Sequence, residues 1–175
     1  FVAWTTTPWT LPANLALAVH PDFDYVSVKS GGRTFIVAAP LAEQFVADCQ
    51  IENAEISSLA RGAQLEGLQT FHPFADRKSP IVCARYVTTE SGTGVVHIAP
   101  GHGLEDYQVG LEYKLDIYCP LDDAGRYVDD GKVPQELVGI SVLDKGDGKN
   151  AANEKVLSML EGRGALLKMR KIQHQ

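Results

Sequence analysis

Residues 91–107 read SGTGVVHIAPGHGLEDY, and this stretch determines how the rest of the chain is interpreted. Its first part, Thr93–Ile98, is β-branched and apolar enough to form a strand. Pro100 and Gly101 end that strand, because this pair favours a turn. Apolar residues then recur at the spacing of one helix face: Leu104, Tyr107, Leu111 and Leu115. The stretch therefore predicts a strand, a glycine turn and a helix.

The predicted turn also carries side chains that titrate or bind substrates: His97, His102, Glu105 and Asp106. A helix start presents free backbone N–H groups and a partial positive charge to whatever lies beside it. Acidic residues in a first helical turn also serve simply as partners of the helix dipole. This stretch alone therefore leaves a functional and a purely structural interpretation open.

Length and composition limit the class of protein. The 175 residues are 45% hydrophobic and 22% charged, which is ordinary for a globular domain, and contain no apolar run of membrane-spanning length. A net charge of −6 excludes nucleic-acid binding by bulk electrostatics, so any such contact must be local. Three widely spaced cysteines without a CxxC pair indicate a reducing environment. We expect residues 1–175 to form a single cytoplasmic domain cut from a longer protein.

The remaining segments predict many short strands and few helices. Strands are expected at 1–4, 14–20, 81–87 and 165–172, with hairpins at 25–37 and 117–128. Helices are expected to begin at Pro40 and after Asn150, in addition to the one after Gly103. Regular βαβ alternation is missing, so the prediction is a mainly β, α+β fold: a β-barrel core decorated with about three helices.

A second polar segment lies near the start of the chain. Thr5, Thr6 and Thr7 precede Pro8-Trp9-Thr10-Leu11-Pro12, and the two prolines hold this segment extended or turned. Such a loop is able to direct hydroxyl and backbone N–H groups toward one point. The structural alternative is a loop whose hydroxyls bond their own backbone, and the segment by itself favours that alternative.

Two metal-site interpretations are weak. Residues 144–150 resemble the first half of a calcium loop, but the glutamate of the twelfth position is missing. His97, His102 and Asp106 match no established zinc spacing. The chain also lacks a nucleophile elbow and a phosphate-binding glycine loop, so it offers no candidate for covalent catalysis.

Residues 4–14 and 92–107 together resemble the signatures of the editing domains of class I aminoacyl-tRNA synthetases. These domains form the connective insertion of the isoleucyl, valyl and leucyl enzymes. Valyl and leucyl members usually carry Thr-Arg-Pro where this chain has Thr7-Pro8-Trp9, and an aspartate where it has Gly103. Both differences favour the isoleucyl type. The resemblance spans most of the chain, with weaker similarity over 146–160, and implies that type of fold.

The resemblance implies an ester hydrolase that removes valine mistakenly attached to the isoleucine tRNA, with water as the nucleophile. It leaves open whether valyl-adenylate is also cleaved, and it implies that this piece alone does not aminoacylate tRNA. The expected partners are the tRNA 3′ end and the remainder of the synthetase, and no cofactor or metal is expected for editing. Two alternatives are a metal-dependent hydrolase and a non-catalytic module that binds the tRNA end.

The resemblance also implies a role for individual residues. Asp106 would bind the α-ammonium group of the misplaced amino acid. His97 would limit the size of its side chain and, as a catalytic residue, bond the ribose or the water. Thr5, Thr6, Thr7 and Asn14 would hold the ester and the attacking water, and Trp4 would form a wall. The terminal adenosine would lie along Gly94, Val95, Val96, His97 and Ile98. For His102 a structural role at the turn is expected.

Overall fold

The computed structural model describes residues 1–144 and 150–169, and the chain divides into two compact units. The first unit comprises Phe1–Thr5, Ala16–Thr70 and Ser79–Ile98. The second unit comprises Thr6–Leu15, Phe71–Lys78 and Ala99–Gln175, less the residues outside the described ranges. Most of the segment 144–150, which resembles a calcium loop only weakly, lies outside the described residues.

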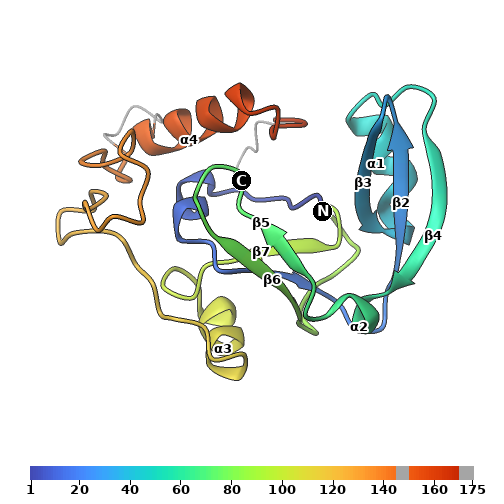
Figure 1. Ribbon diagram of the computed structural model, residues 1–175, viewed down its shortest axis with the longest axis horizontal. Helices are drawn as coiled ribbons and strands as arrows, with labels where there is room; N and C mark the ends of the chain where they lie inside the picture. Colours follow the sequence, from blue (N-terminus) through green and yellow to red (C-terminus); the bar gives the residue numbers. More distant parts are fainter. Residues whose placement is uncertain (145–149, 170–175) are drawn as a thin grey trace. The chain divides into compact units, whose positions relative to one another are not determined.

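The first unit contains two sheets (Figure 1). One has the strand order β5-β6-β1-β7 and is built from β5 (Gln69–Phe71), β6 (Lys78–Cys83), β1 (Ala16–Val19) and β7 (Val95–Ile98). The other has the order β3-β2-β4 and is built from β3 (Arg33–Ala38), β2 (Asp24–Ser30) and β4 (Glu55–Arg61). β1 runs parallel to β6 and antiparallel to β7, whereas the three-stranded sheet is antiparallel.

Short helices accompany these sheets. The 3-10 turn η2 (Ala39–Leu41) leads into α1 (Ala42–Asp48), which packs against β2 and β3 (Figure 1). Phe45 of α1 meets Phe35 of β3 edge to face, with ring centroids 5.7 Å apart. A single-turn helix, α2 (Gly62–Leu65), follows β4. One buried cluster of this unit consists of Val19, Tyr25, Ala38, Leu41, Leu65, Ile81 and Val95.

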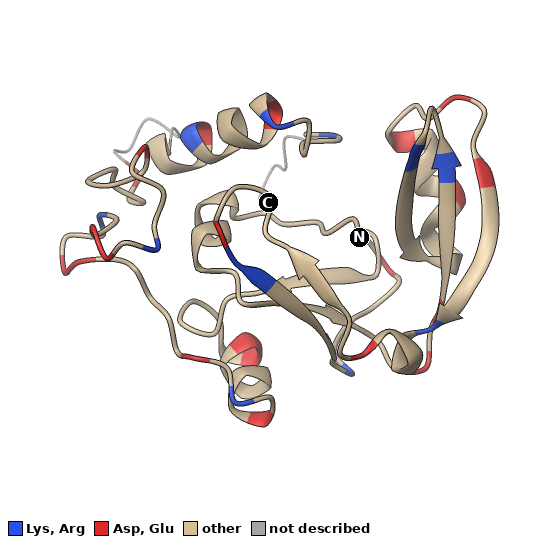
Figure 2. Cartoon of the chain, viewed as in Figure 1, with Lys and Arg blue, Asp and Glu red and all other residues tan. Residues whose placement is uncertain are grey.

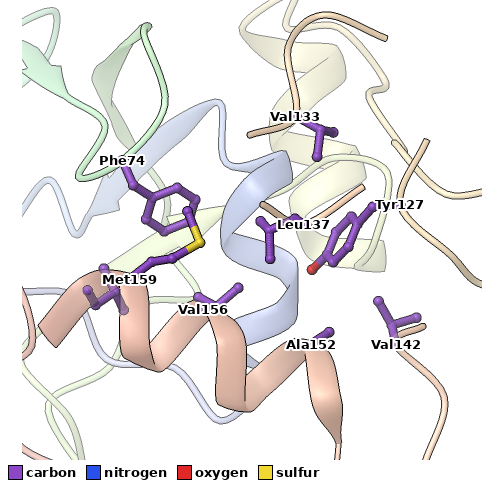
Figure 3. Close-up of a cluster of buried hydrophobic side chains, with 9 residues drawn as sticks. Phe74, Tyr127, Val133, Leu137, Val142, Ala152, Val156 and Met159 are labelled. Atoms are coloured by element: carbon purple, nitrogen blue, oxygen red, sulfur yellow. The ribbon is translucent and has the colours of Figure 1, made fainter. Parts of the chain in front are cut away.

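The second unit is mostly helix and irregular chain. It contains the 3-10 helix η1 (Pro8–Ala13), α3 (Leu104–Glu112) and α4 (Ala151–Gly162). Asn150 caps α4 by accepting a bond from the Asn153 N–H at 2.9 Å. One face of α4 contributes to a core that Figure 3 shows around Leu137. That core consists of Phe74, Tyr127, Val133, Leu137, Val142, Ala152, Val156, Met159 and Leu160.

α3 differs from α4 in how its apolar residues are used. The predicted face is largely exposed: Leu104 by 70%, Tyr107 by 41% and Leu111 by 58%. The buried positions of α3 are Val109 and Gly110. Gly110 is needed because a Cβ there would lie 2.9 Å from the Pro100 ring. The charged residues of α3 are all acidic (Figure 2).

Within the described residues, no helix is both long and apolar enough to cross a membrane.

The α+β prediction is confirmed, as are the 25–37 hairpin and the helices after Pro40, Gly103 and Asn150. The predicted barrel was too specific, because in the described residues the strands form two open sheets, one edged by β5 and β7 and the other by β3 and β4. Residues 1–4 are not a strand, although the Val2 N–H bonds the Ile36 carbonyl at 3.1 Å. Residues 165–169 are also irregular, and 170–172 lie outside the described part.

Replacing Gly94 with alanine should destabilise the protein by more than the cost of backbone strain, because the added Cβ would also clash with Ala38. Gly94 has φ +73°, and a Cβ would lie 2.3 Å from the Ala38 Cβ. Gly32 has nearly the same conformation, φ +75°, with no atom within 4 Å of the added Cβ. We expect Gly94→Ala to lower the free energy of unfolding by about 1–3 kcal/mol more than Gly32→Ala, the usual cost of overpacking. Equal denaturant midpoints for the two variants would contradict this contact.

His72 should make stability depend on acid pH. Burial, aided by the charges of Arg77 and Arg163, lowers the pKa of His72 from 6.5 to about 4. The unfolded chain therefore binds more protons between these values, and stability falls as the pH falls from 6.5 toward 4. We expect the free energy of unfolding to drop by about 3 kcal/mol more in the wild type than in His72→Gln over pH 7 to 4. Parallel pH profiles of denaturant unfolding would refute this.

Candidate functional site

The strand before the turn places His97 inside the first unit. β7 pairs with β1 so that His97 lies opposite Leu17, and the His97 side chain is only 7% exposed. Val95 and Ile98 are buried, whereas Val96 is half-buried. β7 ends the strand order of its sheet, so alternate backbone groups point away from β1.

Gly94 fixes the start of β7. Its carbonyl accepts a hydrogen bond from the Tyr25 hydroxyl at 2.6 Å, and the Thr93 carbonyl accepts one from the Ala38 N–H at 2.8 Å. Burial raises the pKa of Tyr25 to about 12, so this hydroxyl keeps its proton at neutral pH. Trp4 is 43% exposed and lies beside Gly92, where a Cβ would be 3.4 Å from the Trp4 Cβ.

The turn and the start of α3 place Asp106 in the second unit. Gly103 is the N-cap residue in an extended conformation, and Asp106 is the third residue of the helix. The Asp106 carboxylate reaches back and accepts a hydrogen bond from the Ala99 N–H at 2.9 Å through Oδ2. The His102 N–H bonds the Ala99 carbonyl at 2.9 Å, which closes the turn. The sequence therefore places a partly exposed, negatively charged group at a fixed position beside a helix N-terminus.

The turn is tight for a second reason. A Cβ on Gly101 would lie 2.4 Å from the Tyr118 carbonyl oxygen, so only glycine fits there. The His102 ring meets the Trp9 ring edge to face at 5.1 Å, and burial lowers the pKa of His102. These contacts support the structural role expected for His102.

The threonine segment ends at η1. Thr6 and Thr7 are exposed and Thr5 is half-buried, so this part of the loop is accessible. Thr7 is the N-cap of η1, and its carbonyl accepts bonds from the Thr10 N–H at 3.0 Å and the Thr10 hydroxyl at 2.9 Å. Asn14 follows η1 and is 4% exposed.

The predicted site residues divide between the two units. Trp4, Thr5, Gly94, Val95, Val96, His97 and Ile98 belong to the first. Thr6, Thr7, Asn14 and Asp106 belong to the second. In the described part of the chain, no group of three or more histidine, cysteine, aspartate or glutamate side chains is arranged to hold a metal ion. The cysteines in this part of the chain, Cys49, Cys83 and Cys119, are not joined in disulfides.

Sequence reasoning missed residues that hold the η1 backbone: His72, Arg77, Tyr127 and Asn153. Two of them, His72 and Arg77, come from residues 55–79, where the sequence predicts short extended pieces without indicating their partners. Their bonds to η1 join residues far apart in the chain, and no local pattern signals such pairs.

Comparison with known proteins identifies the family. Residues 35–146 match the family model described as "Leucyl-tRNA synthetase, editing domain". The isoleucine–tRNA ligase of Nitratidesulfovibrio vulgaris (strain DP4) is 51% identical over 173 residues, which is 99% of this chain and 17% of that protein. That of Fervidobacterium nodosum is 46% identical over 99% of this chain and 18% of its own length. The chain thus spans about a sixth of the length of these curated relatives.

Solved structures show the same fold at low sequence identity. The crystal structure of GlLeuRS-CP1 superimposes with a TM-score of 0.56 and 15% identity, covering 93% of this chain and 68% of that one. The editing domain of the P. knowlesi cytosolic leucyl-tRNA synthetase gives a TM-score of 0.53 and 16% identity, over 64% of this chain and 51% of that one. With the family match over 35–146, these findings show that the chain belongs to the aminoacyl-tRNA synthetase editing domains.

Proposed function

We propose that this chain hydrolyses the ester that joins valine to the 3′ end of the isoleucine tRNA. Water adds to the ester carbonyl, the bond to the ribose oxygen breaks, and valine and the free tRNA hydroxyl leave. An ester is already activated, so orientation of the water and electrostatic support suffice without a protein nucleophile. Valyl-adenylate is a second candidate substrate, and the rest of a synthetase chain is the expected partner.

The need for such an activity follows from the energetics of small apolar side chains. One methylene in a hydrophobic pocket is worth only about 1–3 kcal/mol, and isoleucine against valine in isoleucyl-tRNA synthetase is the standard illustration. A site that admits valine and excludes isoleucine supplies the missing discrimination. The 51% identity to an isoleucine–tRNA ligase over 99% of this chain supports the isoleucyl assignment.

Asp106 is the observation that carries the proposal. Its carboxylate is fixed by the Ala99 N–H while the side chain stays partly exposed, which suits a group that binds an ammonium ion. We assign the α-ammonium group of the amino acid to Asp106. Thr5, Thr6, Thr7 and Asn14 are assigned to the ester and the attacking water.

The first unit supplies the remaining proposed contacts. β7 is the last strand in the order of its sheet, and we assign the adenine of the terminal adenosine to this strand, along residues 94–98. Trp4 offers an exposed aromatic surface as a wall. His97 is the residue to which we assign the limit on side-chain size.

Neutralising Asp106 should lower the deacylation rate without unfolding the protein. An asparagine keeps an acceptor for the Ala99 N–H but loses the charge, so the melting temperature should stay close to that of the wild type. Deacylation of valyl-tRNA should fall by roughly 10- to 100-fold, since a hydrogen bond to a charged group is worth about 1.5–3 kcal/mol. Glu105→Gln is the matched control, because it removes an exposed carboxylate from the same helical turn. A wild-type rate of valyl-tRNA deacylation by Asp106→Asn under single-turnover conditions would contradict the proposal.

Shortening His97 should weaken discrimination rather than hydrolysis. We expect His97→Ala to accept isoleucyl-tRNA, so that the ratio of valyl to isoleucyl deacylation rates falls toward one, because the limiting side chain is gone. Leu17→Ala, at the paired position of β1, controls for the loss of packing. An unchanged ratio for His97→Ala would exclude the steric role.

A further inference from the structure

The backbone of η1 is held by side chains from elsewhere in the second unit. The Trp9 N–H donates to Asn153 Oδ1 at 2.9 Å, and the Trp9 carbonyl accepts from the Tyr127 hydroxyl. The carbonyl groups of Leu11, Pro12 and Asn14 accept hydrogen bonds from side chains of a single short loop, residues 72–77. Because Pro12 has no N–H, it cannot bond the Trp9 carbonyl three residues earlier, so bonds within the helix alone do not fix this segment.

The 72–77 loop is itself rigid. The His72 N–H donates to the Arg77 carbonyl at 3.0 Å, and the Arg77 N–H donates to the Ala75 carbonyl at 2.9 Å. His72 Nδ1 accepts from the N–H groups of Phe74, at 3.2 Å, and Ala75, at 2.9 Å. Nδ1 must therefore be unprotonated, and Nε2 carries the hydrogen that it donates to the Leu11 carbonyl at 2.8 Å.

Arg77 binds the end of η1 through two nitrogen atoms of its guanidinium group. Nε donates to the Asn14 carbonyl at 3.0 Å, and Nη2 donates to the Pro12 carbonyl. The guanidinium also lies 5.5 Å from the centre of the Tyr118 ring. Tyr118 in turn donates to Asp130 at 2.8 Å. Only arginine presents planar donors in this fixed arrangement, because lysine offers a single point charge.

We propose that Arg77 and His72 are positioning residues for ester hydrolysis: they fix the carbonyls of Leu11, Pro12 and Asn14. The inference rests on the function proposed above, in which Thr7 and Asn14, at the two ends of η1, hold the ester and the water. A displacement of about 1 Å in such a segment is enough to cost roughly 100-fold in rate. Arg77 and His72 are not assigned any contact with the substrate.

The test compares Arg77→Lys and Arg77→Met with the wild type. Arg85→Met is the matched control, since Arg85 is exposed and pairs with Asp22 on the surface of the first unit. Single-turnover deacylation of valyl-tRNA gives the rate, and titration with a non-hydrolysable valyl-adenosine analogue gives the affinity. Hydrogen exchange of the Asn14 amide, which bonds the Leu11 carbonyl at 2.9 Å, reports on η1 directly. The Tyr107 amide of α3 reports on the rest of the second unit.

We expect the rate to fall by about 30-fold or more in Arg77→Met and about 10-fold in Arg77→Lys, with affinity within about threefold of wild type. Asn14 exchange should quicken at least about tenfold while Tyr107 exchange stays unchanged. Equal quickening of both amides, or full rates with a loosened Asn14, would overturn the inference. If Arg77→Met fails to fold, the rate, affinity and hydrogen exchange of Arg77→Lys test the inference by the same criteria. Absence of deacylation by the wild type would instead refute the proposed function, while the exchange comparison would still test whether Arg77 holds η1.

Discussion

The second unit depends on how the carbonyl groups of η1 are satisfied. Two prolines shape this short 3-10 helix: Pro8 is its first residue, where the helix uses no N–H, and Pro12 lacks the N–H that would bond the Trp9 carbonyl. Its carbonyls are therefore bound by His72, Arg77 and Tyr127, which come from distant parts of the chain. Trp9 and Leu11 of the same helix pack against the core formed with α4. The hydrogen bonds and the apolar contacts thus fix one segment from two sides.

Local structure could be predicted from the sequence where the residues that determine it are neighbours in the chain. Gly31 and Gly32, both with positive φ, form the turn of the β2–β3 hairpin, and Asn150 caps α4 as its side chain allows. Prediction failed at Phe1–Trp4, because apolar and β-prone residues form a strand only when a partner is available. Here the Val2 N–H bonds one carbonyl, while the Thr93 hydroxyl bonds the Val2 carbonyl.

In the candidate site, too, short-range interactions could be predicted from the sequence and long-range ones could not. The turn before α3 could be predicted because its glycines and Asp106 are close in sequence, and Asp106 bonds a residue only seven positions away. The bonds of Arg77 to Pro12 and Asn14 span more than sixty positions, and that of Tyr127 to Trp9 spans 118. A single sequence shows no spacing that links such residues, so the side chains that hold η1 appear only in the structure.

α3 shows what periodicity does and does not establish. The recurrence of Leu104, Tyr107 and Leu111 correctly predicts a helix, yet all three are exposed. The helix is fixed instead by the close approach of Gly110 to Pro100 and by the bond from Ala99 to Asp106. Both contacts lie on the side of the glycine turn, so the residues that anchor α3 are also those that orient its acidic first turn. A substitution that loosens this anchor would therefore displace the carboxylate.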